Sequence, residues 1–84
     1  MAKVELSPRA SEELLSLPVV IKARIFGIVA RLEQWPQVSG AKPMSGPLAG
    51  HYRIRTGDYR VLFSVEKGTV LIERIGHRDK FYEG

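Results

Sequence analysis

One tight turn with an alternating segment on either side constrains most of what this chain can fold into. Residues 52–63 carry alternating apolar and charged side chains on both sides of Gly57-Asp58. Glycine at the first position of a two-residue loop suits a type II′ turn, and such a loop fixes the register of a β-hairpin. We therefore expect Arg55 to lie directly opposite Arg60.

The same register predicts that three guanidinium groups share one face of the hairpin, those of Arg53, Arg55 and Arg60. Like charges that face each other in a sheet are destabilising. A polyanion such as RNA phosphate explains this arrangement better than a set of merely solvated surface charges. Tyr52 and Tyr59 alternate to the other face, where we expect both to pack in the core.

The rest of the chain completes a single α+β domain over residues 1–84, with the order strand, helix, helix and three strands. Two helices are expected to pack on one face of a small, mainly antiparallel sheet and to leave the arginine face open. Residues 36–50 contain three prolines and three glycines, so we expect one long loop without a regular element there. The predicted elements are a strand at 3–6, a helix from Ser7-Pro8 to Leu15, a second helix from Pro18 to Trp35, the hairpin strands, and a strand at 69–75 after a turn at Lys67-Gly68.

Apolar residues at three- and four-residue steps make the second helix amphipathic. Its predicted core stripe is Ile21, Ile25, Ile28, Leu32 and Trp35, widened by Phe26 and Val29. Gly27 interrupts this helix at a cost of about 1 kcal/mol relative to alanine, which predicts a close approach to a neighbouring helix or sheet.

Composition narrows the function classes. An excess of 13 Lys and Arg over 9 Asp and Glu gives a net charge of +4 and favours an acidic partner. The absence of cysteine excludes disulfides and thiolate zinc sites, and the scattered carboxylates predict no metal or other cofactor. No apolar run approaches the length of a membrane span or a signal-peptide core, so we expect a cytoplasmic protein.

The segment after the last strand collects four polar side chains, those of His77, Arg78, Lys80 and Tyr82. Phosphodiester cleavage without metal needs a base for the 2′-hydroxyl, an acid for the 5′-oxygen and fixed positive charge on the phosphate. Arginine suits the third task because its planar donors grip two phosphate oxygens. A lone histidine is more often structural than catalytic, and a tyrosine near the end of the chain can equally pack on the sheet. His51 falls at the far end of the arginine face, where it is a weak substrate contact.

Four segments occur in an order and spacing that identify a family: 42–46, 52–55, 57–63, and 75–78 with Tyr82 following. Together with the element order, they resemble the RelE/ParE superfamily of toxins from type II toxin–antitoxin systems. The resemblance implies an mRNA interferase, which cuts mRNA, typically in the ribosomal A site, and leaves a cyclic phosphate and a free 5′-hydroxyl. It also implies a cognate antitoxin, expected on the apolar stripe of the second helix and on the C-terminal tail.

The resemblance implies residue roles as well. Arginines stabilise the charged phosphorane and seat the RNA backbone, while His77 and Tyr82 share proton transfer and base stacking, and which of the two acts as base stays open. Arginine itself cannot serve as the general base. The predicted catalytic residues are Arg60, Arg78, His77 and Tyr82, and the predicted RNA-binding residues are Arg53, Arg55, Lys80 and His51.

Two other functions fit the same resemblance. One is the ParE branch, whose members inhibit DNA gyrase and are not nucleases. The other is a degenerate toxin that acts only as an antitoxin-binding module. The arginine set together with His77 and Tyr82 favours the nuclease, since the gyrase-directed branch generally lacks that set.

Overall fold

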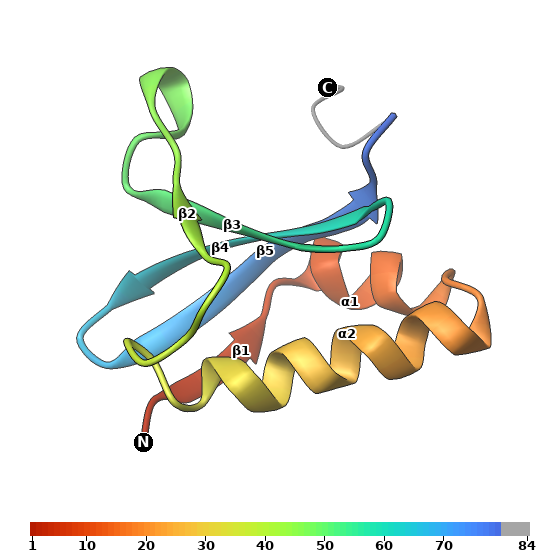
Figure 1. Cartoon of the computed structure of the whole chain (residues 1–84), viewed down its shortest axis with the longest axis horizontal. Coiled ribbons are helices and arrows are strands. Elements are labelled where there is room, and N and C mark those ends of the chain that lie inside the picture. Colours follow the sequence, from red (N-terminus) through yellow and green to blue (C-terminus); the bar gives the residue numbers. More distant parts are fainter. Residues whose placement is uncertain (80–84) are drawn as a thin grey trace.

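The computed structural model describes residues 1–79. Two α-helices cover one face of a five-stranded sheet, and no α-helix among residues 1–79 covers the opposite face, here called the open face (Figure 1). This confirms the predicted α+β architecture. The elements are β1 (Lys3–Leu6), α1 (Pro8–Leu15), α2 (Val19–Leu32), β2 (Lys42–Pro43), the 3-10 helix η1 (Gly46–Leu48), β3 (His51–Thr56), β4 (Tyr59–Glu66) and β5 (Thr69–His77).

The strand order is β1-β5-β4-β3-β2. β1 runs parallel to β5, and the three other pairs are antiparallel, so the sheet is mainly antiparallel as predicted. Neither helix within the described part of the chain combines the length and hydrophobicity needed to cross a bilayer.

The start of α1 follows the capping pattern in the sequence. The Ser7 hydroxyl accepts a hydrogen bond from the backbone N–H of Ala10, and Pro8 stands in the first turn, where its missing N–H costs nothing. The same hydroxyl donates to the carbonyl of Glu73 at 3.0 Å, which ties α1 to β5.

The second helix is shorter than predicted because it ends at Leu32 instead of Trp35. The backbone N–H of Trp35 donates to the carbonyl of Leu32, three residues earlier, so the chain tightens into a turn just before Pro36. Trp35 still packs on the core, with its ring 4.8 Å from that of Tyr52 and 5.3 Å from that of Phe63. The core position predicted for Tyr52 is therefore confirmed.

The buried stripe of α2 consists of Ile25, Ile28 and Leu32, as predicted, while Phe26 is 58% exposed. Successive residues of an α-helix are rotated by about 100° around the helix axis. Phe26 follows the buried Ile25 and therefore points away from the sheet. The prediction of a close contact at Gly27 is also wrong. A Cβ atom added there would meet nothing within 4 Å.

The predicted long loop contains a strand. Lys42-Pro43 forms β2 and pairs with β3, and η1 follows it. Proline is tolerated there because β2 is an edge strand, where a missing N–H breaks no ladder on the outer side. In Figure 1 the segment with η1 projects from the sheet on the side away from the helices.

Candidate nucleic-acid interface

The β3–β4 hairpin has the register expected from its turn. Arg55 pairs with Arg60, and Arg53 pairs with Leu62. Gly57 has a φ of +58°, the positive value that the first loop position of a type II′ turn requires. Because Val61, Phe63 and Val65 contact the helices' core, the alternate residues of β4 point to the open face.

β2 adds a cation that the sequence prediction missed. Lys42 pairs with Arg53 and so extends the same face by one strand. Lys42 lies in one of the segments that carried the family resemblance, but its place beside Arg53 depends on the edge pairing of β2. We call Lys42, Arg53, Arg55 and Arg60 the cationic row.

No carboxylate within residues 1–79 makes an ion pair with any member of the cationic row. The Nε atom of Arg53 and the Nη1 atom of Arg60 are buried and lack a hydrogen-bond partner. Donors of a desolvated cation that lack an acceptor are energetically costly. The row is therefore a concentration of positive charge that no carboxylate of residues 1–79 offsets.

Apolar packing holds the side chains of the row on the sheet. Leu62 lies on the open face, yet it is only 7% exposed. It is flanked by Arg53 on β3 and Arg74 on β5, and arginine stems readily cover apolar surface while their charged ends stay outside. The guanidinium of Arg74 itself binds Glu13 of α1 at 3.2 Å, so Arg74 serves the packing of α1 and lies outside the cationic row.

A hydrogen-bonded group marks the middle of the open face. Glu73 Oε2 accepts a hydrogen bond from the Ser64 hydroxyl at 2.8 Å, and His51 Nε2 lies 2.8 Å from the same oxygen in an ion-pair contact. Glu73 is the extra residue of a bulge, since Leu62 pairs with Arg74 and Phe63 pairs with Ile72. The bulge brings Glu73 to the same side as Ser64. His51 thus lies at the end of the arginine face, as predicted, but its imidazole is held by a carboxylate.

The end of β5 separates two residues that the sequence placed in one site. The backbone N–H of Arg78 donates to the carbonyl of Asp58 at 2.7 Å, so Arg78 adjoins the hairpin turn. Its exposed Nε lies 3.8 Å from Asp58 and 3.7 Å from Asp79, both long contacts. His77 pairs with Tyr59, and the two rings meet edge to face at 5.3 Å.

By strand alternation His77 and Tyr59 lie on the helix side of the sheet, opposite to Arg60. The backbone N–H of Asp79 donates to His77 Nδ1 at 3.2 Å, and the Asp79 carboxylate lies 3.4 Å from the same nitrogen. Lys80 and Tyr82 lie outside the described residues. Within residues 1–79, no group of three side chains is placed to hold a metal ion.

Comparison with known proteins now identifies the family. Residues 4–82 match the model of the ParE toxin of the type II toxin–antitoxin system parDE. The chain belongs to the RelE/ParE superfamily of toxins of type II toxin–antitoxin systems. The sequence matches none of the curated proteins with which it was compared.

Solved structures show the same fold. The chain is similar to a protein in the toxin–antitoxin complex RelBE2 of Mycobacterium tuberculosis, with 31% identity and a TM-score of 0.81 over 92% of this chain and 91% of the other. The isolated RelE toxin of E. coli has 18% identity and a TM-score of 0.77, covering 92% and 84% of the two chains. A chain of the RelB–RelE complex of Methanococcus jannaschii has 24% identity and a TM-score of 0.76, covering 89% and 91%.

Proposed function

We propose that this toxin is a metal-independent endoribonuclease that cuts mRNA on the ribosome, and hence acts in the cytoplasm. The observation that carries the proposal is the cationic row, whose two buried guanidinium donors have no partner within the described chain. A phosphodiester brings the negative charge that offsets repulsion between Arg55 and Arg60, and its oxygens accept from the accessible N–H groups of the row.

The proposed reaction is attack of the 2′-oxygen on the adjacent phosphorus, which expels the 5′-oxygen and leaves a cyclic phosphate. One group takes the 2′-hydroxyl proton, and a second gives a proton to the leaving 5′-oxygen. Arg60 and Arg78 stabilise the charge that grows on the phosphorane, while Arg53, Arg55 and Lys42 hold the neighbouring backbone. In this scheme Tyr82 and His77 are the candidates for proton transfer, and Lys80 and His51 are further RNA contacts.

Two other candidate functions compete with the nuclease. The family model is that of a ParE toxin, which favours inhibition of DNA gyrase as the second candidate. A degenerate toxin, acting only as an antitoxin-binding module, is the third. The two guanidinium donors of Arg53 and Arg60 that have no partner among residues 1–79 support the nuclease over both.

The decisive experiment compares mRNA ends in a translation reaction with DNA supercoiling by gyrase. We expect the parent protein to produce new mRNA ends by primer extension and to leave supercoiling intact. Arg60→Ala is expected to lower cleavage about 100-fold, by analogy with the loss of one oxyanion donor. Arg9→Ala, on α1, is the matched control and retains cleavage. Inhibited supercoiling with intact mRNA would reject the nuclease.

We further propose that an antitoxin controls this toxin by docking on the outward face of α2. The solved relatives include toxin–antitoxin complexes. The buried stripe of α2 is used by the core, so it is not accessible to a partner. The opposite face is exposed and apolar at four- and three-residue steps, and its members are Val19, Ala23, Phe26, Gly27 and Ala30.

The charges of α2 indicate the chemistry of this partner. The helix VVIKARIFGIVARL has three basic residues and no acidic one. A second copy of α2 would bring like charges together, whereas an acidic amphipathic helix would pair with them and cover the apolar face. The antitoxin is expected to supply such a helix.

A further inference from the structure

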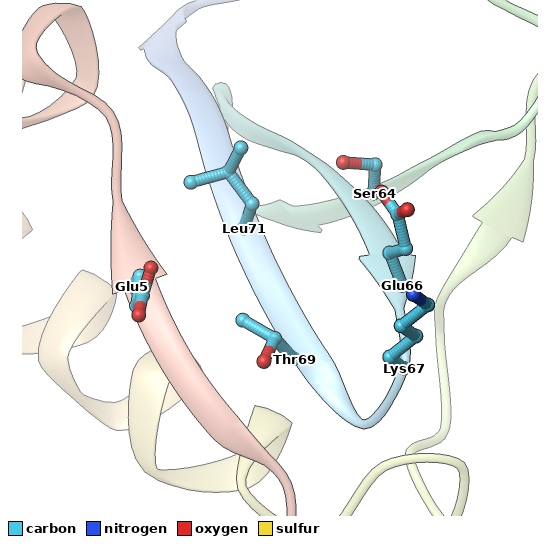
Figure 2. A pocket seen from close by; sticks show the side chains of 6 residues that line it. All are labelled: Glu5, Ser64, Glu66, Lys67, Thr69 and Leu71. Carbon is cyan, nitrogen blue, oxygen red and sulfur yellow. The ribbon is translucent and has the colours of Figure 1, made fainter.

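A hollow on the open face lies apart from the cationic row. Its volume is about 340 Å³, and it is lined by Glu5, Ser64, Glu66, Lys67, Thr69 and Leu71. Figure 2 shows these side chains gathered from β1, β4, β5 and the β4–β5 turn. The hollow has the size of the smallest sites that hold a ring-sized ligand.

The lining is polar at the rim and close to neutral overall. Glu5 is paired with Lys3 at 3.1 Å, and Lys67 follows Glu66 in the chain. Leu71 supplies apolar surface, and it does not belong to the core cluster behind the sheet. A phosphate would find little net positive charge here. A flat, uncharged ring with polar edges fits better, because it can cover Leu71 and exchange hydrogen bonds with the rim.

The hollow and the cationic row lie on one continuous surface. Arg60, Leu62, Ser64 and Glu66 follow each other at alternate positions of β4 and share the open face. Ser64 is about 13 Å from Arg60 along the strand, at roughly 3.3 Å per residue. A single RNA strand bound by the row can therefore extend towards the hollow, past the group formed by His51, Ser64 and Glu73.

We propose that this hollow is a nucleobase subsite that gives the toxin its sequence preference, a proposal that builds on the proposed RNA substrate. Single-stranded RNA is read by stacking of unpaired bases and by hydrogen bonds to their edges. The base is held on Leu71, with Ser64 and Thr69 at the rim, a few nucleotides from the phosphate that Arg60 binds.

Glu66 determines which base is preferred. Its carboxylate makes no ion pair among the described residues, so both oxygens are available as acceptors. Guanine presents two adjacent N–H donors on its Watson–Crick edge, which match the two oxygens of one carboxylate. Uracil presents one such donor between two carbonyl oxygens, which a carboxylate repels. The subsite therefore favours guanine over uracil.

The test uses the full chain with ribosomes programmed by mRNAs that differ only in the base at single positions near the cleavage site. At one of these positions, we expect the mRNA with guanine to be cleaved about tenfold faster than the mRNA with uracil. A difference of this size is typical of a good bidentate base contact. Glu66→Gln replaces one of the two acceptor oxygens by an NH₂ donor, so it reduces the difference to within about twofold while other cleavage continues. Glu12→Gln, an exposed carboxylate on α1, keeps the parent preference.

A binding measurement separates this proposal from the nuclease proposal. Fluorescence anisotropy with labelled 2′-O-methyl oligonucleotides, which cannot be cleaved by 2′-oxygen attack, reports base preference without chemistry. If the parent cuts RNA but Glu66→Gln leaves the preference unchanged, the subsite is rejected and the nuclease stands. If nothing is cut yet guanine oligonucleotides bind better and Glu66→Gln abolishes that, the subsite stands and the nuclease falls. Equal affinity for guanine and uracil oligonucleotides in the parent rejects the subsite.

Discussion

Arg55 and Arg60 show at the scale of single residues how this surface is organised. A like-charged pair at facing positions costs a few tenths of a kcal/mol to about 1 kcal/mol, and Lys42 beside Arg53 repeats the pattern one strand away. Leu62, between Arg53 and Arg74 on the same face, is only 7% exposed. The stability given up here is consistent with a surface that is completed by a bound anion.

The two candidates for proton transfer, His77 and Tyr82, are expected to contribute unequally to the rate of mRNA cleavage. The His77 ring packs on Tyr59, on the side of the sheet opposite Arg60. We therefore predict that Tyr82→Phe lowers mRNA cleavage about 100-fold or more, while His77→Ala lowers it less than tenfold. Single-turnover cleavage of the same mRNA by both variants measures the difference. The reverse order would assign the main proton-transfer step to His77.

At the scale of elements, the hairpin and α2 use glycine for opposite reasons. Gly57 adopts a positive φ that a residue with a Cβ enters only at a cost, and Arg24 Nη1 would lie 3.5 Å from that Cβ. Gly27 sits in an ordinary helix with open space around it. Its position on the outward face of α2 suits the close approach of a partner helix, since no contact within the described chain requires it.

These two glycines give a matched pair of stability predictions. Gly57→Ala is expected to lower the free energy of unfolding by about 1–2 kcal/mol, because alanine must adopt a left-handed backbone conformation. Gly27→Ala is expected to raise it by about 0.5–1 kcal/mol, because alanine has a higher helix propensity and meets no obstacle. Urea denaturation of both variants decides the signs. Destabilisation by Gly27→Ala would reveal a contact at that face in the free protein.

At the scale of the whole molecule, the two proposed binding surfaces lie on opposite sides of the sheet. The open face carries the cationic row and the hollow, and the helix layer covers the core and presents the outward face of α2 to solvent (Figure 1). A partner bound to α2 is on the reverse side from the row. Antitoxin affinity and RNA cleavage should therefore respond to different substitutions.

Phe26→Asp tests this separation. Phe26 is 58% exposed, so its replacement should leave the free toxin folded and its mRNA cleavage unchanged. A buried aromatic anchor in an interface is commonly worth 2 kcal/mol or more, so antitoxin affinity should fall at least about 30-fold. Titration calorimetry with the antitoxin measures this, and Arg60→Ala, which alters only the open face, should bind it as the parent does. Unchanged affinity of Phe26→Asp would place the antitoxin elsewhere.

The sequence alone determined the features that depend on neighbours along the chain. The Gly57-Asp58 turn set the register that brings Arg55 opposite Arg60, and Ser7-Pro8 set the start of α1. Helical spacing identified Ile25, Ile28 and Leu32 as core. These are local effects of backbone dihedrals and side-chain periodicity, which act over a few residues.

Tertiary structure decided what lies beside these elements. The pairing that places Lys42 next to Arg53, and the bulge that turns Glu73 towards His51, join residues that belong to different elements of the chain. The side of the sheet that receives His77 depends on the register between β4 and β5 and the bulge within it. Such contacts are selected by the packing of the whole sheet, because each of these short segments is compatible with several partners until the core fixes one.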